Sequence, residues 1–113
     1  MHDLLLNKIA VVTGCKKGIG KSILTKFAEN KAEVFACARK QDKEFENYCL
    51  EISKKYKTKI HTVFFDFEDA EAIKSAILKI KTLTDKVDIL VNCAGIIHTS
   101  LFQMTKIEDL KKI

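Results

Sequence analysis

Residues 8–20, KIAVVTGCKKGIG, decide the fold of this chain. Residues 8–13 form a short run of β-branched and apolar side chains, which is typical of a strand buried on both faces. A glycine-rich segment follows at once, and from Ile19 onward apolar residues recur every three or four positions, as on one face of a helix. The stretch therefore predicts a strand, a tight glycine turn and a helix in direct succession.

Short apolar runs and amphipathic stretches alternate along the rest of the chain. Further strands are predicted at residues 33–38, 60–65 and 87–91, with helices at 42–57, at 69–80 and from about Thr105. Four strands joined by right-handed helical crossovers form a parallel sheet that is covered on both faces. The predicted fold is therefore an α/β, Rossmann-type doubly wound sheet of order 3-2-1-4, with three α/β/α layers, which we expect to be incomplete on its C-terminal side.

The length and composition fit a single globular unit. The 113 residues are 47% hydrophobic and 31% charged, and they include no proline or repeat that would mark a domain boundary. We therefore interpret residues 1–113 as one domain or part of one. No apolar run approaches the roughly 18 to 20 residues that cross a bilayer, and no secretory signal is recognisable, so we expect a cytoplasmic protein without a membrane partner.

Charge and cysteine usage argue against two other classes of protein. The net charge is +5, but every basic residue except Arg39 is a lysine, and the lysines are scattered along the chain. Nucleic-acid-binding proteins concentrate basic residues and favour arginine, so no nucleic-acid partner is predicted. The four cysteines form no CxxC pair, which disfavours a metal site and indicates reduced, buried thiols: Cys15, Cys37, Cys49 and Cys93.

The turn after the first strand has the composition of a phosphate-binding loop. A helix N-terminus offers unpaired N–H groups and the positive end of the helix dipole, which suit the phosphates of a nucleotide. In this interpretation Gly14 allows the tight turn, Gly18 lets the backbone approach a pyrophosphate, and Gly20 lets the helix pack against the strand. The spacing is GxxxGxG rather than GxGxxG, and a purely structural turn is the alternative.

The end of the second predicted strand indicates which dinucleotide would bind. About 20 residues after the last glycine, dinucleotide folds place an acid for a ribose 2′-hydroxyl or a basic residue for a 2′-phosphate. Arg39 lies 19 residues after Gly20, and no acid occurs before Asp42. Lys16 and Lys17 of the glycine loop are possible helpers. We therefore expect NADP as the cofactor, with NAD less favoured, although a solvated loop charge is the alternative for Arg39.

These residues resemble motifs of the short-chain dehydrogenase/reductase family, in particular its classical members. The family's TGxxxGIG motif matches residues 13–20, its NNAG motif matches residues 92–95, and its acid after the third strand matches Asp66. The resemblance implies an NADP-dependent oxidoreductase that transfers a hydride between nicotinamide and a small-molecule carbonyl or alcohol substrate. It is slightly closer to 3-oxoacyl-acyl-carrier-protein reductases than to sugar or steroid enzymes, and we expect a homo-oligomer when the protein is complete.

The resemblance also assigns cofactor-binding residues. It implies pyrophosphate contacts in the glycine loop, adenine contacts after the third strand and nicotinamide-ribose contacts after the fourth. Cys93 stands where the family has its second asparagine, which leaves a backbone contact at that position. The assigned residues are Gly14, Lys16, Lys17, Gly18, Ile19, Gly20, Arg39, Asp66, Phe67, Asn92, Cys93, Ala94 and Gly95.

No catalytic residue is assigned within the chain. The family's catalytic Asn, Ser and Tyr-x-x-x-Lys pair would follow Ile113, so residues 1–113 resemble the N-terminal NADP-binding half of a family domain and are expected to be inactive alone. Two other interpretations remain. A non-catalytic nucleotide-binding module would have the same motifs. A P-loop hydrolase would explain Gly20, Lys21 and Ser22 as the end of GxxxxGKS, but it requires glycine at the position of Cys15.

Overall fold

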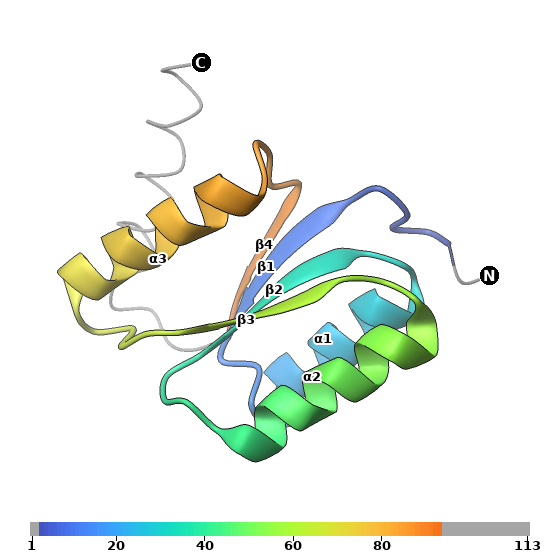
Figure 1. Ribbon diagram of the computed structural model, residues 1–113, viewed down its shortest axis with the longest axis horizontal. Helices are drawn as coiled ribbons and strands as arrows, with labels where there is room; N and C mark the ends of the chain where they lie inside the picture. The colour runs from blue at the N-terminus through green and yellow to red at the C-terminus, as the bar shows by residue number, and fades with distance from the viewer. Residues whose placement is uncertain (1–2, 94–113) are drawn as a thin grey trace.

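The computed structural model describes residues 3–93 of the chain. Within them lies a parallel four-stranded sheet with strand order β3-β2-β1-β4, flanked by helices (Figure 1). The elements in chain order are β1 (Ile9–Thr13), α1 (Gly18–Glu29), β2 (Glu33–Ala38), α2 (Lys43–Tyr56), β3 (Ile60–Phe64), α3 (Ala70–Leu83) and β4 (Ile89–Asn92). The predicted α/β class and the sheet order 3-2-1-4 are confirmed.

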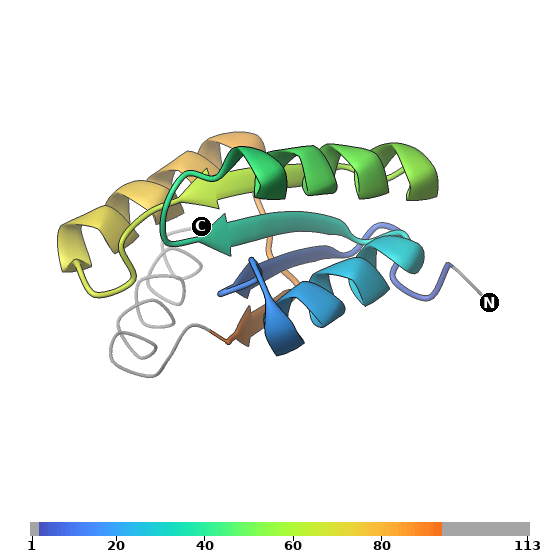
Figure 2. The same cartoon turned by 90° about the horizontal axis from the view of Figure 1, so that it is seen from below.

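Helices cover both faces of the sheet, and the layers are visible in two orientations (Figures 1 and 2). Successive side chains of a strand point to opposite faces, so each central strand contributes to two separate cores. On one face Leu24 of α1 and Phe45 of α2 pack over β1 and β2. On the other face Ile77 of α3 packs with Phe35 of β2. This is why β1 and β2 consist almost entirely of apolar residues.

The fourth strand begins two residues later than predicted and is only half-buried. The side chain of Asp88 explains the later start, because its Oδ2 accepts a 2.8 Å hydrogen bond from the backbone N–H of Ile9. The N–H of Asp88 in turn donates to the carbonyl of Ile9 at 2.8 Å. The hydrogen bond from Ile9 is the main cause that lowers the pKa of the Asp88 carboxyl. Asp88 therefore ties β4 to the start of β1.

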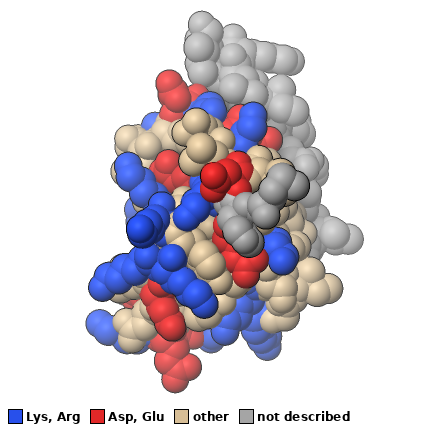
Figure 3. All heavy atoms as spheres, turned by 90° about the vertical axis from the view of Figure 1, so that its right-hand side faces the viewer, with Lys and Arg blue, Asp and Glu red and all other residues tan. Residues whose placement is uncertain are grey.

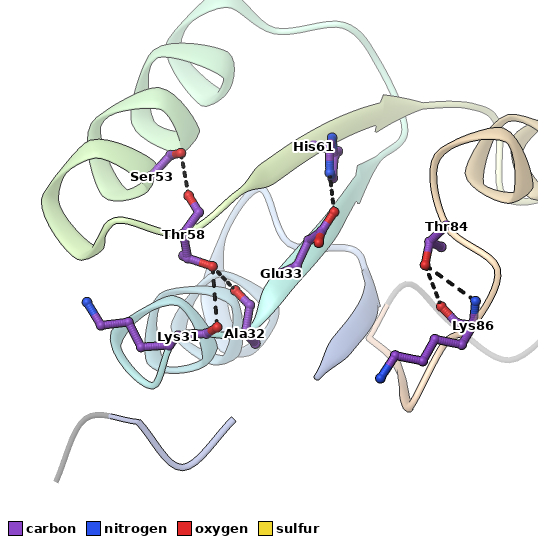
Figure 4. A network of polar contacts seen from close by, with 8 residues as sticks. All are labelled: Lys31, Ala32, Glu33, Ser53, Thr58, His61, Thr84 and Lys86. Atoms are coloured by element: carbon purple, nitrogen blue, oxygen red, sulfur yellow. Dashed lines mark hydrogen bonds and ion pairs between the residues drawn. The ribbon is translucent and has the colours of Figure 1, made fainter. Parts of the chain in front are cut away.

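Polar contacts join residues at the amino ends of β2 and β3 (Figure 4). The Thr58 hydroxyl donates to the carbonyl of Ala32 at 2.6 Å, and the Ser53 hydroxyl donates to the carbonyl of Thr58 at 2.6 Å. Nearby, Glu33 and His61 are joined across β2 and β3 by a 2.7 Å contact. Lysine side chains are numerous on this side of the molecule (Figure 3), where the negative ends of the helix dipoles lie.

The four cysteines differ in their exposure to solvent. Cys15, Cys37 and Cys49 are buried free thiols, as predicted, whereas Cys93 is exposed because it follows the last residue of β4. The prediction of a buried thiol was therefore wrong for Cys93. Burial raises the pKa of Cys15 and of Cys49 to about 12 and that of Cys37 well above its usual range.

Two kinds of feature are absent from the described part of the chain. No helix within residues 3–93 is long and apolar enough to span a bilayer. The same residues contain no cluster of three or more His, Cys, Asp or Glu side chains that could hold a metal ion. The predicted helix near Thr105 and the assigned residues Ala94 and Gly95 lie outside the described residues.

Candidate functional site

The candidate site lies at the carboxyl edge of the sheet. Because the strands are parallel, all of them end at this edge, and the segments that follow them lie next to one another. The register pairs Thr13 at the end of β1 with Cys37 of β2 and with Asn92 of β4. The glycine loop, Arg39 and Cys93 therefore follow neighbouring strands of one sheet, as the sequence predicted.

A buried cysteine anchors the beginning of the glycine loop to β2. Gly14 adopts a φ of 68°, a left-handed conformation that glycine accepts without steric cost. Its N–H donates to the carbonyl of Cys37 at 3.0 Å, and the Cys15 thiol donates to the same carbonyl at 3.3 Å. The sequence pattern gives no signal for this role of Cys15, because it marks the residue only as a small apolar side chain.

Gly18 and Gly20 are required for different reasons. A Cβ built on Gly20 would lie 2.1 Å from the carbonyl oxygen of Gly14 and 3.0 Å from the Cα of Cys15, so α1 passes directly over the turn. A Cβ on Gly18 would meet no protein atom within 4 Å, although its φ of 64° disfavours other residues. Gly20 thus packs the helix on the turn, whereas the space above Gly18 is open.

The N-terminus of α1 differs from those of α2 and α3. Asp42 and Asp69 cap α2 and α3 by accepting hydrogen bonds from two first-turn N–H groups each, and each of these helices carries at least one acid in its first turn. Lys17, at the start of α1, makes no capping hydrogen bond, and the first turn of α1 contains no acid. The N–H groups of its first turn are therefore available to an anion, and no nearby carboxylate in that turn would repel it.

Arg39 follows β2 and contacts two acids that follow β3. Its Nη2 lies 3.2 Å from Oδ1 of Asp66 and 3.2 Å from Oε2 of Glu68. All three side chains are about half exposed, so both ion pairs are screened by water. The sequence indicated Arg39 and Asp66 but gave no signal for Glu68, since the contact joins residues 29 positions apart.

Lys16 links the glycine loop to the start of α2. Its Nζ lies 2.9 Å from Oδ2 of Asp42, and this hydrogen bond is the main cause that lowers the pKa of the Asp42 carboxyl. Lys17 is exposed beside it. The two lysines predicted as helpers therefore differ, because Lys16 has a carboxylate partner in Asp42 and Lys17 has its side chain directed to solvent.

The ends of β1 and β4 are joined through side chains. The Thr13 hydroxyl donates to Oδ1 of Asn92 at 2.7 Å, and the N–H of Cys93 donates to the carbonyl of Thr13 at 3.2 Å. Phe67, on the other side of the site, is half-buried and packs edge-on against Phe65, with ring centroids 4.9 Å apart. Asn92 and Phe67 are therefore both held in place by the strand ends.

The position of Lys21 disagrees with a P-loop. In a P-loop the lysine that follows the last glycine must reach the bound phosphates. Here Lys21 Nζ lies 4.3 Å from the ring centroid of Tyr48, in a groove between α1 and α2. Lys21 therefore contacts Tyr48 in this groove, and it is not placed to bind phosphates as the lysine of a P-loop does.

Comparisons with known proteins give a consistent result. The family model of short chain dehydrogenases matches residues 8–113. A 3-oxoacyl-acyl-carrier-protein reductase of Aquifex aeolicus is 33% identical over 113 residues, which is all of this chain and 45% of the relative. An NADPH-dependent 3-dehydrocapnine reductase of Ornithobacterium rhinotracheale is 37% identical over 107 residues, covering 93% of this chain and 36% of the relative.

A solved structure extends the likeness to three dimensions. L-sorbose reductase from Gluconobacter frateurii, solved with NADPH and L-sorbose, superposes with a TM-score of 0.75 at 28% identity, over 85% of this chain and 36% of that one. The chain spans less than half of the length of each of these relatives. The family match, the fold and the glycine loop agree, and the chain belongs to the short-chain dehydrogenase family.

Proposed function

We propose that the whole protein is an NADP-dependent oxidoreductase that transfers a hydride between nicotinamide and a carbonyl or alcohol carbon. The observation that carries the proposal is the position of Arg39 directly after β2, next to a glycine loop and an uncapped helix N-terminus. A 2′-phosphate at the end of β2 requires a basic partner, and a ribose 2′-hydroxyl usually has an acidic one.

The residues of the glycine loop fit a bound pyrophosphate. The uncapped first turn of α1 supplies N–H donors, and the open space above Gly18 allows a phosphate oxygen to approach the backbone. Gly14 and Gly20 give the turn the shape that keeps this approach open, and Ile19 is exposed beside it. We assign the pyrophosphate to this loop.

The remaining contacts follow from the other strand ends. In this proposal Arg39, helped by Lys16 and Lys17, binds the 2′-phosphate, and Asp66 with Phe67 binds the adenine. Asn92 and Cys93, together with Ala94 and Gly95, lie by the nicotinamide ribose. The cofactor, when bound, supplies or accepts the hydride. The protein positions it at the carboxyl edge of the sheet, and residues that act on the substrate are expected after Ile113.

Two relatives support NADP as the cofactor. The 3-dehydrocapnine reductase is described as NADPH-dependent, and the L-sorbose reductase was solved with NADPH. Their substrates differ from each other and from that of the 3-oxoacyl-acyl-carrier-protein reductase, and we propose only the shared class, a small carbonyl or alcohol compound. We further propose that the whole protein is a cytoplasmic homo-oligomer. Residues 1–113 by themselves are proposed to be inactive.

Titration of the whole protein with NADPH and NADH tests the proposal. Replacement Arg39→Ala removes charge-assisted hydrogen bonds worth about 1.5 to 3 kcal/mol each, so NADPH should bind roughly 10- to 100-fold more weakly. NADH binding should change little. Lys59→Ala, which removes one positive charge at the opposite edge of the sheet, is the control. Equal losses of both nucleotides would show that Arg39 does not recognise the phosphate.

A non-catalytic nucleotide-binding module is the second candidate, because every residue that we assign within the described part of the chain is assigned to cofactor binding. The two candidates differ in one measurement. An enzyme of this family oxidises NADPH in the presence of a reducible carbonyl compound, whereas a binding module binds the nucleotide without turnover. A panel of keto esters, sugars and steroids, followed at the nicotinamide absorbance, distinguishes them.

A further inference from the structure

The only arginine of the chain is shared between two acids. A single nitrogen of Arg39, Nη2, lies 3.2 Å from a carboxylate oxygen of Asp66 and 3.2 Å from one of Glu68. A guanidinium recognises a phosphate or a carboxylate through the same N–H groups. A 2′-phosphate that binds Arg39 through the same nitrogen therefore competes with carboxylates of the protein itself.

The two carboxylates differ in their other contacts. Oδ1 of Asp66 also accepts a 2.9 Å hydrogen bond from the N–H of Glu68, and the Asp66 carbonyl accepts one from Asp69 at 3.2 Å. Asp66 therefore shapes the turn that leads from β3 into α3. The Glu68 side chain is 55% exposed and reaches Arg39 through its terminal carboxylate. Removal of the charge on Glu68 leaves the hydrogen bonds of this turn in place.

We propose that Glu68 is a specificity-determining residue that lowers the preference of this site for NADP over NAD. The inference rests on the proposed function, since it concerns the same 2′-phosphate position. A bound 2′-phosphate must displace the Glu68 carboxylate from Arg39 or lie close to its negative charge. Both alternatives weaken the binding of NADP.

Glu68 is compatible with the 2′-hydroxyl of NAD, whereas it opposes the 2′-phosphate of NADP. A hydroxyl carries no charge and can donate a hydrogen bond to a carboxylate. It therefore needs no displacement of the Arg39–Glu68 pair and meets no charge repulsion. In this arrangement Arg39 favours NADP, the neighbouring acid moderates that preference, and NAD remains an acceptable ligand.

The variant Glu68→Gln in the whole protein tests this inference. Glutamine keeps the length and shape of the side chain but removes its charge. Because the pair is half exposed, we expect NADPH to bind about 3- to 10-fold more tightly, with NADH unchanged or slightly weaker. The gain should shrink as the salt concentration rises, because the charges involved are exposed to solvent and salt screens them. Glu71→Gln removes the same charge from the first turn of α3 and serves as the control.

A double-mutant cycle separates this role from a structural one. In an Arg39→Ala background, Glu68→Gln should have a smaller effect on NADPH binding, because the carboxylate no longer competes for the guanidinium and only its repulsion of the phosphate remains. Unchanged or weaker NADPH binding in the single variant, or an equal change for both nucleotides, would overturn the inference while the proposed function stands. Failure of the wild-type protein to bind either nucleotide would overturn the proposed function and this inference together.

Discussion

The contrast between Gly18 and Gly20 gives the sharpest quantitative prediction. In Gly20→Ala the new Cβ would lie 2.1 Å from the Gly14 carbonyl oxygen and 2.8 Å from its carbon, so backbone atoms of the turn or of α1 must move. Overpacking of this kind costs about 1 to 3 kcal/mol and more when, as here, the neighbours are backbone rather than flexible side chains. We expect about 3 kcal/mol at Gly20.

Gly18→Ala meets no protein atom, and its cost comes from the backbone alone. A φ of 64° disfavours an L-residue by about 1 to 2 kcal/mol, and the reduced freedom of the unfolded chain returns about 0.4 to 1 kcal/mol. The net loss should be near 1 kcal/mol. Gly18→Val should abolish NADPH binding while leaving the helical circular dichroism close to that of the wild type, because the side chain fills the space proposed for the pyrophosphate.

Thermal melts of the whole protein, followed by circular dichroism, measure both costs. For a protein of 150 to 250 residues, each kcal/mol lowers the Tm by about 2 to 4 °C. Gly20→Ala should therefore melt roughly 6 to 12 °C below the wild type, and Gly18→Ala only a few degrees below it. A Gly20→Ala protein that melts like the wild type, or one more stable than Gly18→Ala, would refute the packing of α1 on the turn.

Three further predictions concern residues around the site. Asp69→Ala should destabilise the protein by about 1 kcal/mol in urea unfolding, whereas Asp69→Asn, which keeps a capping oxygen for α3, should cost far less. Since the folded-state pKa of Asp88 is lowered, its contribution to stability is complete at neutral pH and is lost as the pH falls below about 4, and Asp88→Asn should flatten that part of the stability–pH profile. Among the four cysteines, iodoacetamide should modify Cys93 first in the native protein, and NADPH should slow that reaction; modification of buried Cys37 at the same rate would contradict the fold.

The sequence determined the order and type of the elements because the relevant signals are local. The β-branched run at residues 8–13, the glycines after it and the helical spacing from Ile19 each reflect the conformation of a few neighbouring residues. Right-handed crossovers then leave only a few sheet orders, and 3-2-1-4 is one of them. The position of Arg39 relative to Gly20 is also fixed along the chain, so the proposed cofactor site was predictable at the level of its segments.

The contacts of the site depended on the tertiary structure, because they join residues that are distant in sequence. The ion pair of Arg39 with Glu68 spans 29 positions, and the hydrogen bond of Thr13 to Asn92 spans 79. No periodicity encodes such pairs, since they arise only when parallel strands bring their carboxyl ends to one edge. The clash at Gly20 and the exposure of Cys93 have the same origin, as both depend on which segments pack against each other rather than on the residue itself.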